Sequence, residues 1–189
     1  MTGKTRHHRY VSGKQGSTIS SLNLHGVIDA HVSAAYQRDW SMPGFGTGTC
    51  IETSFGDVPV ELLRRGDPVR TLDGQFLEVA FVDTVQFDRR YLLTHPQAQP
   101  VELPIDALGR DPPSKTTLLS GGQLVVKGEN GRNNLTVACA ELISSRSARR
   151  VAYGYFSYHI FHFGVRCAVF ANGICVEVEP EPYGSKQVD

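Results

Sequence analysis

The chain has 189 residues, 40% of them hydrophobic and 20% charged, which is the composition of an ordinary globular domain. Its 19 Lys and Arg residues balance 19 Asp and Glu residues, so nothing indicates a nucleic-acid-binding surface, which needs a basic patch. No apolar run approaches the ~20 residues that span a bilayer, and none follows the basic opening MTGKTRHHRYVSGKQGS as in a secretory signal, so we expect a soluble chain.

Residues 1–41 show the weakest pattern. Ser, Gly, Thr and Asn interrupt this stretch, and only LNLHGVIDAHV alternates between apolar and polar residues. We expect a poorly structured linker, or the end of a preceding module to which the following domain is fused or from which it is released.

Residues 42–180 have the texture of an antiparallel β domain, in which short runs of Val, Ile, Phe, Tyr and Thr alternate with turns. TCIETSFG predicts a strand that ends in a turn at residues 55–57. VPVELLRRGD predicts a helical turn closed by Gly66. PVRTLDGQFLEVAFVDTVQF predicts two strands joined across Asp73-Gly74, which favours a type I′ hairpin.

The second half of this region continues in the same way. KTTLLSGGQLVVKGENG and LTVACAEL are strand candidates around Gly-rich turns, and RCAVF and ICVEVEP flank Asn172-Gly173, a strong hairpin signal. No long amphipathic helix appears. Residues 181–189 are polar and predict a frayed tail. The fold class is therefore all-β, with little helix.

The four cysteines form no C-x-x-C pair, so their spacing predicts no metal site. A chain of this length buries a core without a disulfide framework. We interpret Cys139, Cys167 and Cys175 as small buried hydrophobic residues on strands. No pattern in the chain indicates a cofactor.

Several segments, taken in order, carry a resemblance. GFGTGTCIETSFGDVPVELLRRGDPVRTLDG resembles the opening block of bacterial hedgehog/intein (Hint) domains, through residues 48–51, 59–63 and 66–69. HPQAQPVELPIDALG, LLSGGQLVV and VFANGICVE resemble later blocks of the same family. The resemblance implies a pseudo-symmetric antiparallel β domain, often part of a larger secreted bacterial protein, and the activity of self-cleavage or splicing.

The family reaction begins when a Cys or Ser attacks the carbonyl of the residue before it. A hydroxyl and a His, three residues apart on a turn, bind the scissile amide and protonate its nitrogen. By resemblance the nucleophile position falls on Gly44, the hydroxyl on Ser120 and the His position on Gln123. Glycine cannot attack, and glutamine has no pKa near neutrality, so the resemblance implies that two roles are lost.

Other residues offer alternatives. Cys50 could be the nucleophile if the first strand began late, although a cysteine packed on a strand is the simpler interpretation. His159 and His162 lie in the aromatic segment YFSYHIFHF, which favours packed rather than catalytic histidines. The chain lacks the terminal His-Asn pair of splicing inteins, so splicing is not expected.

Three hypotheses follow. The first is a Hint domain that has lost catalysis, by nature or by substitution, and serves as a structural or interaction module. The second is an active hedgehog-like domain that cleaves itself near residues 43–50 through a Cys50 thioester. The third is an unrelated β-sandwich, against which the position of Trp40 outside the strand region counts.

Overall fold

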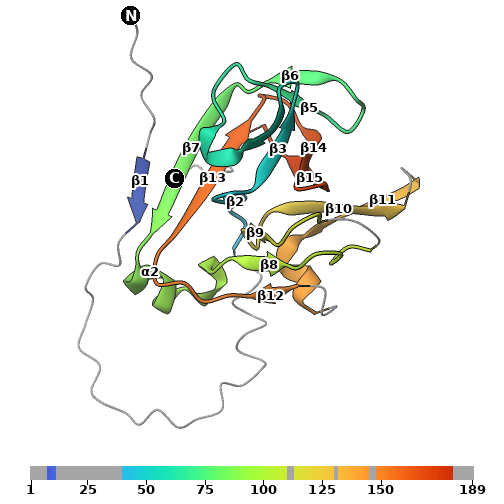
Figure 1. Cartoon of the computed structure of the whole chain (residues 1–189). Coiled ribbons are helices and arrows are strands. Elements are labelled where there is room, and N and C mark those ends of the chain that lie inside the picture. Colours follow the sequence, from blue (N-terminus) through green and yellow to red (C-terminus); the bar gives the residue numbers. More distant parts are fainter. Residues whose placement is uncertain (1–7, 12–39, 110–112, 130–131, 145–147, 181–189) are drawn as a thin grey trace, which may run out of the picture.

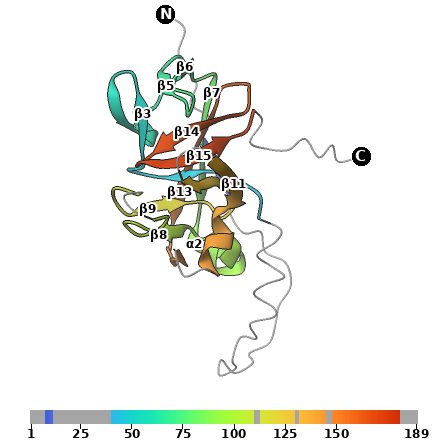
Figure 2. The ribbon, with the colours of Figure 1, turned by 90° about the vertical axis from the view of Figure 1, so that its right-hand side faces the viewer.

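The computed structural model describes residues 8–11, 40–109, 113–129, 132–144 and 148–180. As predicted, its regular structure is nearly all antiparallel β, arranged in two sheets (Figures 1 and 2). The first sheet contains, in spatial order, β1 (His8–Val11), β7 (Phe81–Phe87), β13 (Phe156–His162), β2 (Phe45–Gly46), β9 (Thr117–Leu119), β8 (Val101–Leu103) and β12 (Arg149–Arg150). The second contains β11 (Arg132–Ala138), β10 (Leu124–Glu129), β15 (Ile174–Val178), β14 (Cys167–Ala171), β3 (Cys50–Thr53), β5 (Pro68–Arg70) and β6 (Phe76–Glu78), with β4 (Gly56–Pro59) paired to β3.

Helical structure in the described residues is short. It consists of α2 (Arg89–Thr94) and the 3-10 turns η1 (Val60–Leu62), η2 (Pro96–Ala98) and η3 (Cys139–Ile143). The Asp88 carboxylate caps α2 by accepting a hydrogen bond from the Tyr91 amide at 2.7 Å. None of these helices is long and apolar enough to cross a membrane.

The two longest strands of the first sheet, β7 and β13, run side by side along the domain (Figure 1). They pair along their full length, from Phe81 opposite His162 to Phe87 opposite Phe156. β13 also pairs with β2, which places Tyr158 opposite Gly46 and His159 opposite Phe45. The segment that enters β2 therefore runs beside the middle of β13.

The two predicted hairpins form, but only one has the predicted turn. Asn172 and Gly173, with φ angles of 50° and 81°, join β14 directly to β15, as a type I′ turn requires. Between β5 and β6, the Gly74 amide donates to the Thr71 carbonyl at 2.9 Å and Gly74 has φ 82°. This geometry is a three-residue loop with a left-handed glycine, so the prediction of a type I′ turn at this hairpin is wrong.

Two further local expectations need correction. The predicted helical turn is η1, but it ends at the extended residue Leu63 rather than at Gly66, which belongs to the next turn. Cys139 is fully buried as predicted, yet it begins η3 and does not lie on a strand. Cys167 and Cys175 do lie on β14 and β15, where each is half-buried.

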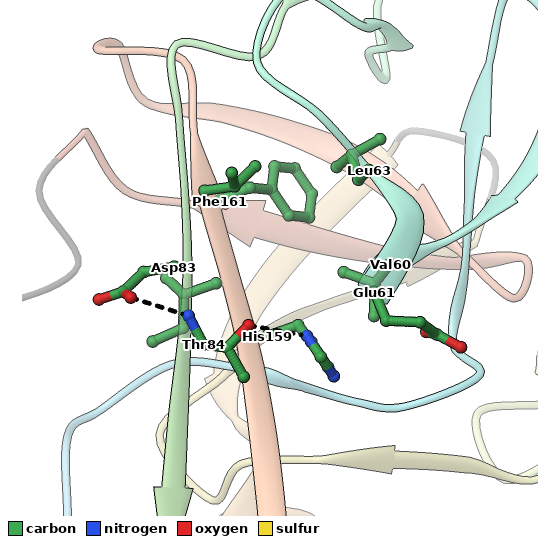
Figure 3. A pocket seen from close by; sticks show the side chains of 9 residues that line it. Val60, Glu61, Leu63, Asp83, Thr84, His159 and Phe161 are labelled. Carbon is green, nitrogen blue, oxygen red and sulfur yellow. Dashed lines mark hydrogen bonds between the residues drawn. The ribbon is translucent and has the colours of Figure 1, made fainter. Parts of the chain in front are cut away.

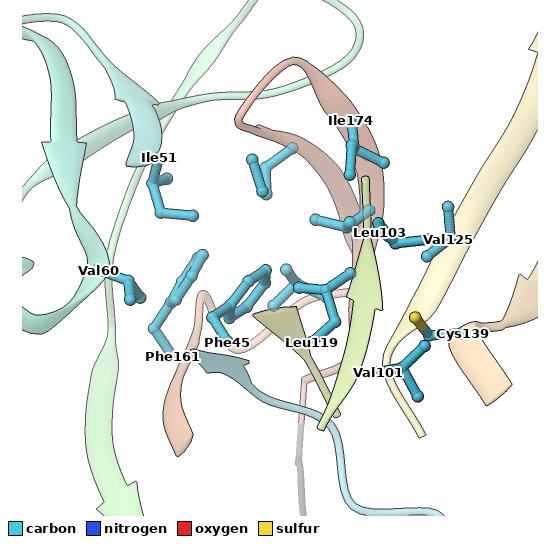
Figure 4. Packing of buried hydrophobic residues seen from close by; sticks show 14 of the residues in the cluster. Phe45, Ile51, Val60, Val101, Leu103, Leu119, Val125, Cys139, Phe161 and Ile174 are labelled. Atoms are coloured by element: carbon cyan, nitrogen blue, oxygen red, sulfur yellow. The ribbon is translucent and has the colours of Figure 1, made fainter. Parts of the chain in front are cut away.

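The buried hydrophobic residues form two clusters, and the larger one joins the two sheets. The larger one takes side chains from both sheets, and Figure 4 shows Ile51, Val125, Phe161 and Leu119 pointing into the same interior. Burial of this apolar surface is the main favourable term in folding. The smaller cluster lies on the first sheet beside α2 and consists of Val85, Phe87, Leu92, Ala98, Phe156, Tyr158 and Ile160, with Trp40, Met42, Tyr91 and Leu118 packed against it.

Candidate functional site

The turn between β9 and β10 contains the predicted Ser120 and Gln123, both almost completely buried. The backbone amide of Gln123 donates to the Ser120 carbonyl at 3.0 Å and closes the turn. The start of η3 holds it from outside, because the Cys139 amide donates to the Gln123 carbonyl at 2.8 Å. Both side chains thus project from a buried turn that backbone hydrogen bonds hold in place.

Gly44, the predicted nucleophile position, lies directly against this turn. The Ser120 amide donates to the Gly44 carbonyl at 2.9 Å, and the Gly44 amide donates to Oε1 of Gln123 at 3.2 Å. The structure therefore brings together three of the four predicted site residues, across 79 positions of sequence between Gly44 and Gln123.

Gln123 is oriented by its other hydrogen bonds. Its Nε2 donates to the Glu177 carbonyl at 2.9 Å and to the Leu124 carbonyl at 3.3 Å. Those two acceptors require the NH₂ end of the side chain, so Oε1 must face Gly44. At the Gly44 nitrogen, Gln123 is therefore an acceptor that carries no proton.

The Ser120 hydroxyl is committed to the segment that precedes Gly44. It donates its proton to the Met42 carbonyl at 2.5 Å and accepts from the Trp40 indole Nε1 at 2.8 Å. The Pro43 carbonyl, which belongs to the peptide bond before Gly44, is a different acceptor. The one hydroxyl proton is thus directed one residue upstream of that bond.

Position 44 also lacks space for a side chain. A Cβ atom built on Gly44 would lie 2.8 Å from the Cβ of Tyr158. Tyr158 is fully buried and its phenol donates to the Ala98 carbonyl at 2.9 Å, and burial raises its pKa above the ordinary value. A tyrosine held at both ends thus occupies the place where a nucleophilic side chain would start.

Cys50, the alternative nucleophile, lies elsewhere, on β3. Its amide donates to Oδ1 of Asn172 at 2.9 Å and its carbonyl accepts from the Asn172 amide at 2.8 Å. Its sulfur accepts a hydrogen bond from Nζ of Lys115 at 3.0 Å. These contacts tie Cys50 to the β14–β15 turn and not to Ser120 or Gln123.

The histidines of β13 are packed, as expected. Nε2 and Nδ1 of His159 lie 3.0 Å and 3.2 Å from the hydroxyls of Thr47 and Thr84, beside a hollow of about 10 Å³ (Figure 3). That volume is barely enough for one water molecule. His159 follows Tyr158 on the strand, so the two side chains point to opposite faces and His159 is turned away from Gly44.

Sequence reasoning missed three residues of this site. Trp40 and Tyr158 are connected to it only by tertiary contacts and left no local signal. Gly122 had one, since a glycine beside a predicted turn often marks close approach of another backbone. A Cβ there would lie 2.5 Å from the Ser41 carbonyl carbon. Among the described residues, no group of three or more His, Cys, Asp or Glu side chains is placed to hold a metal ion.

The chain is similar to several solved structures. Three intein structures are similar: a splice-inactive variant of the AceL NrdHF class 3 split intein (10% identity, 73% of this chain and 98% of that one, TM-score 0.41), the MchDnaB-1 intein (12%, 71% and 99%, 0.44) and a variant of the latter (14%, 71% and 98%, 0.41). No curated protein sequence matches the chain.

The family itself is identified by sequence. The profile of the Hint domain matches residues 43–179, which is most of the chain and begins one residue before Gly44. The alternative of an unrelated β-sandwich is therefore wrong. By this match, the chain belongs to the Hint domain family.

Proposed function

We propose that this Hint domain has lost self-cleavage and acts as a structural or interaction module. The observation that carries the proposal is the orientation of Gln123, whose Oε1 accepts from the Gly44 amide while Nε2 is held by two carbonyls. Cleavage before residue 44 needs a donor that protonates the departing nitrogen. The side chain at that nitrogen has no proton to give.

Two further features support the proposal. Gly44 supplies no nucleophile, and the Cβ of Tyr158 blocks the start of one. The Ser120 hydroxyl donates to the Met42 carbonyl and so does not polarise the Pro43 carbonyl, which an acyl shift at Gly44 would require. At the Pro43–Gly44 peptide bond, these residues therefore supply no nucleophile, no hydroxyl donor to the carbonyl and no proton for the nitrogen.

The same proposal assigns residues 42–180 to the Hint domain, residues 1–41 to a linker or the end of a preceding module, and residues 181–189 to a tail. Within a larger bacterial protein, such a module would connect its neighbour to the rest of the chain without releasing it. Its partner is then the chain on either side of it.

The direct test is the intact mass of the full chain behind a soluble tag, incubated for days with and without dithiothreitol. We expect the full-length mass under both conditions. A cleavage-competent Hint domain behind the same tag is the positive control. Splitting at Pro43–Gly44 or at Thr49–Cys50, accelerated by the thiol, would overturn the proposal.

An active domain using Cys50 remains the second candidate. In its favour, the sulfur is the family's type of nucleophile and lies 3.0 Å from Nζ of Lys115, which donates a hydrogen bond to it. Against it, the peptide bond before Cys50 is built into the fold, because the Thr49 carbonyl accepts from the Val60 amide at 2.8 Å. Substituting Cys50→Ala in the mass assay, with Cys175→Ala as a matched half-buried control, separates the two candidates: only a Cys50-dependent cut would support activity.

A further inference from the structure

The segment that precedes Gly44 is held by the domain as a ligand is held. The Trp40 indole Nε1 donates to the Ser120 hydroxyl at 2.8 Å, and the same hydroxyl donates to the Met42 carbonyl at 2.5 Å. The Trp40 and Met42 side chains both pack against the smaller hydrophobic cluster. The Trp40 ring meets Phe87 edge-on, with 5.7 Å between ring centroids. One hydroxyl therefore joins a side chain and a backbone group of the segment.

Gly122 makes room for this segment. A Cβ at Gly122 would lie 2.5 Å from the Ser41 carbonyl carbon and 2.6 Å from the Met42 carbonyl oxygen. These neighbours are backbone atoms, so they cannot turn aside as the end of a flexible side chain could. Because Gly122 has no side chain, the backbone of residues 41 and 42 can pass in van der Waals contact with it.

We infer that Ser120, Gly122 and Gln123, together with the rings of Phe87 and Tyr158, form a peptide-binding cradle whose permanent ligand is residues 40–43 of the same chain. Trp40 is the anchor: its partly buried ring packs against the smaller hydrophobic cluster and its one polar group is hydrogen-bonded, as is common for aromatic residues at the centre of peptide recognition. The Gly44 amide closes the cradle through Gln123. Most of this ligand lies upstream of residue 43, where the match to the family begins.

The inference rests on the proposed loss of cleavage, because a cut before Gly44 would release the ligand. In an uncut chain, the cradle fixes the upstream polypeptide to the domain. The interaction module of the proposed function thus has a defined partner, which is its own upstream segment. The segment contributes the Trp40 indole, the Met42 side chain and a backbone that passes over Gly122.

Trp40 is the chain's only tryptophan, so its fluorescence reports on the cradle in the full chain. We expect an emission maximum at shorter wavelength than that of the urea-unfolded chain, and acrylamide quenching that is several-fold weaker. Gly122→Ala should move both values toward those of the unfolded chain. It should also open the Trp40–Ser41 bond to chymotrypsin, which cuts after exposed tryptophan.

The neighbouring glycine provides the matched control. A Cβ at Gly121 would meet side-chain atoms of Arg150 at 3.3 Å and of Ala140 at 3.4 Å rather than the backbone of residues 41 and 42, so Gly121→Ala should leave Trp40 protected. Ser120→Ala adds no volume and removes the acceptor of the indole, so it should raise quenching even if Gly122→Ala fails to fold. Far-UV circular dichroism shows which variants are folded.

The outcomes separate this inference from the proposed function. A full-length mass with a Trp40 as quenchable as in urea would overturn the cradle while the loss of cleavage stood. Equal protection of Trp40 in Gly121→Ala, Ser120→Ala and folded Gly122→Ala would also overturn it. Spontaneous loss of residues 1–43, seen by mass, would instead overturn the proposed function.

Discussion

The Cβ of Tyr158 lies 2.8 Å from the point where a side chain at Gly44 would begin. Carbon atoms in contact normally stand ~3.5–4.0 Å apart. Tyr158 belongs to β13, which is paired with β7 over its whole length and with β2 on its other side. A larger residue at position 44 must therefore displace a central strand or the segment that carries position 44.

We predict that Gly44→Ala destabilises the domain by about 1–3 kcal/mol, the usual cost of added volume in a packed interior. The measurement is the free energy of unfolding in urea. Gly154→Ala is the control, since a Cβ there meets nothing within 4 Å and its cost should be within ~0.5 kcal/mol. Unchanged stability of Gly44→Ala would show that β13 or the segment yields easily.

The same contact bears on restoring the family reaction. The double variant Gly44→Cys with Gln123→His supplies a nucleophile and a proton carrier, but the added Cβ meets Tyr158 and the Ser120 hydroxyl still faces Met42. We expect no cleavage by intact mass over days with dithiothreitol. Release of residues 1–43 would show that the site adapts around a new side chain.

We predict that Gln123→Leu costs at least about 2 kcal/mol, because it leaves the Gly44 amide and the Glu177 carbonyl without their hydrogen bonds to Gln123 in a buried site. Urea unfolding measures the loss. The matched control is Gln75→Leu, an exposed glutamine, with an expected change within ~0.5 kcal/mol. Equal stabilities for the two variants would contradict the orientation of the Gln123 amide described above.

The sequence allowed the fold and the centre of the site to be predicted for a physical reason. Turn residues such as Asn172-Gly173 act locally, and the ordered motifs around Gly44 and Ser120 belong to a chain path that the family shares. Trp40 could not be placed, because its hydrogen bond to Ser120 spans 80 positions and follows no strand or helix period. Tyr158 looked like any apolar residue of β13, and its contact with Gly44 depends on the register of β2 against that strand.

Asn172 is the third position that we expect to be sensitive. It is 5% exposed with φ 50°, its Oδ1 accepts from the Cys50 amide, and its Nδ2 donates to the Thr117 hydroxyl at 2.8 Å. Asn172→Ala should cost about 2–4 kcal/mol, since it loses both bonds and places alanine in a left-handed conformation.

The matched variant at this turn is Asn172→Gly, which loses the same bonds but tolerates the conformation. It should recover about 1 kcal/mol relative to Asn172→Ala. Thermal and urea unfolding of the two variants give the difference. Identical stabilities would mean that the backbone conformation contributes nothing measurable here.

The fifth prediction concerns alkaline pH. Burial raises the pKa of the Cys139 thiol from 9.0 to about 12, and those of Cys167 and Cys175 to about 11. A raised folded-state pKa gives stability that is complete below pH 9 and is lost as pH rises toward 12. The fully buried Cys139 thiol should lower the free energy of unfolding by up to about 1.4 kcal/mol per pH unit in this range. The half-buried Cys167 and Cys175 thiols should lower it less, because solvent screens them.

The free energy of unfolding, measured in urea from pH 8 to 10.5, should therefore fall above pH 9. Cys139→Ala should flatten that decline, whatever its effect on stability at pH 8. Iodoacetamide at pH 8 should leave Cys139 unmodified in the folded chain. A decline of the same slope in the variant would show that other groups carry the alkaline transition.

The bond from Trp40 to Ser120 also has a mechanical consequence. When the chain upstream of residue 40 is pulled, the tension reaches the indole bond and the packed ring before it reaches β2. The Met42 carbonyl and the Gly44 amide engage the same turn a few residues later, so they share the load with Trp40. The two-residue strand β2 thereby carries less of the load, so a force applied to the upstream segment should not separate β2 from the sheet first.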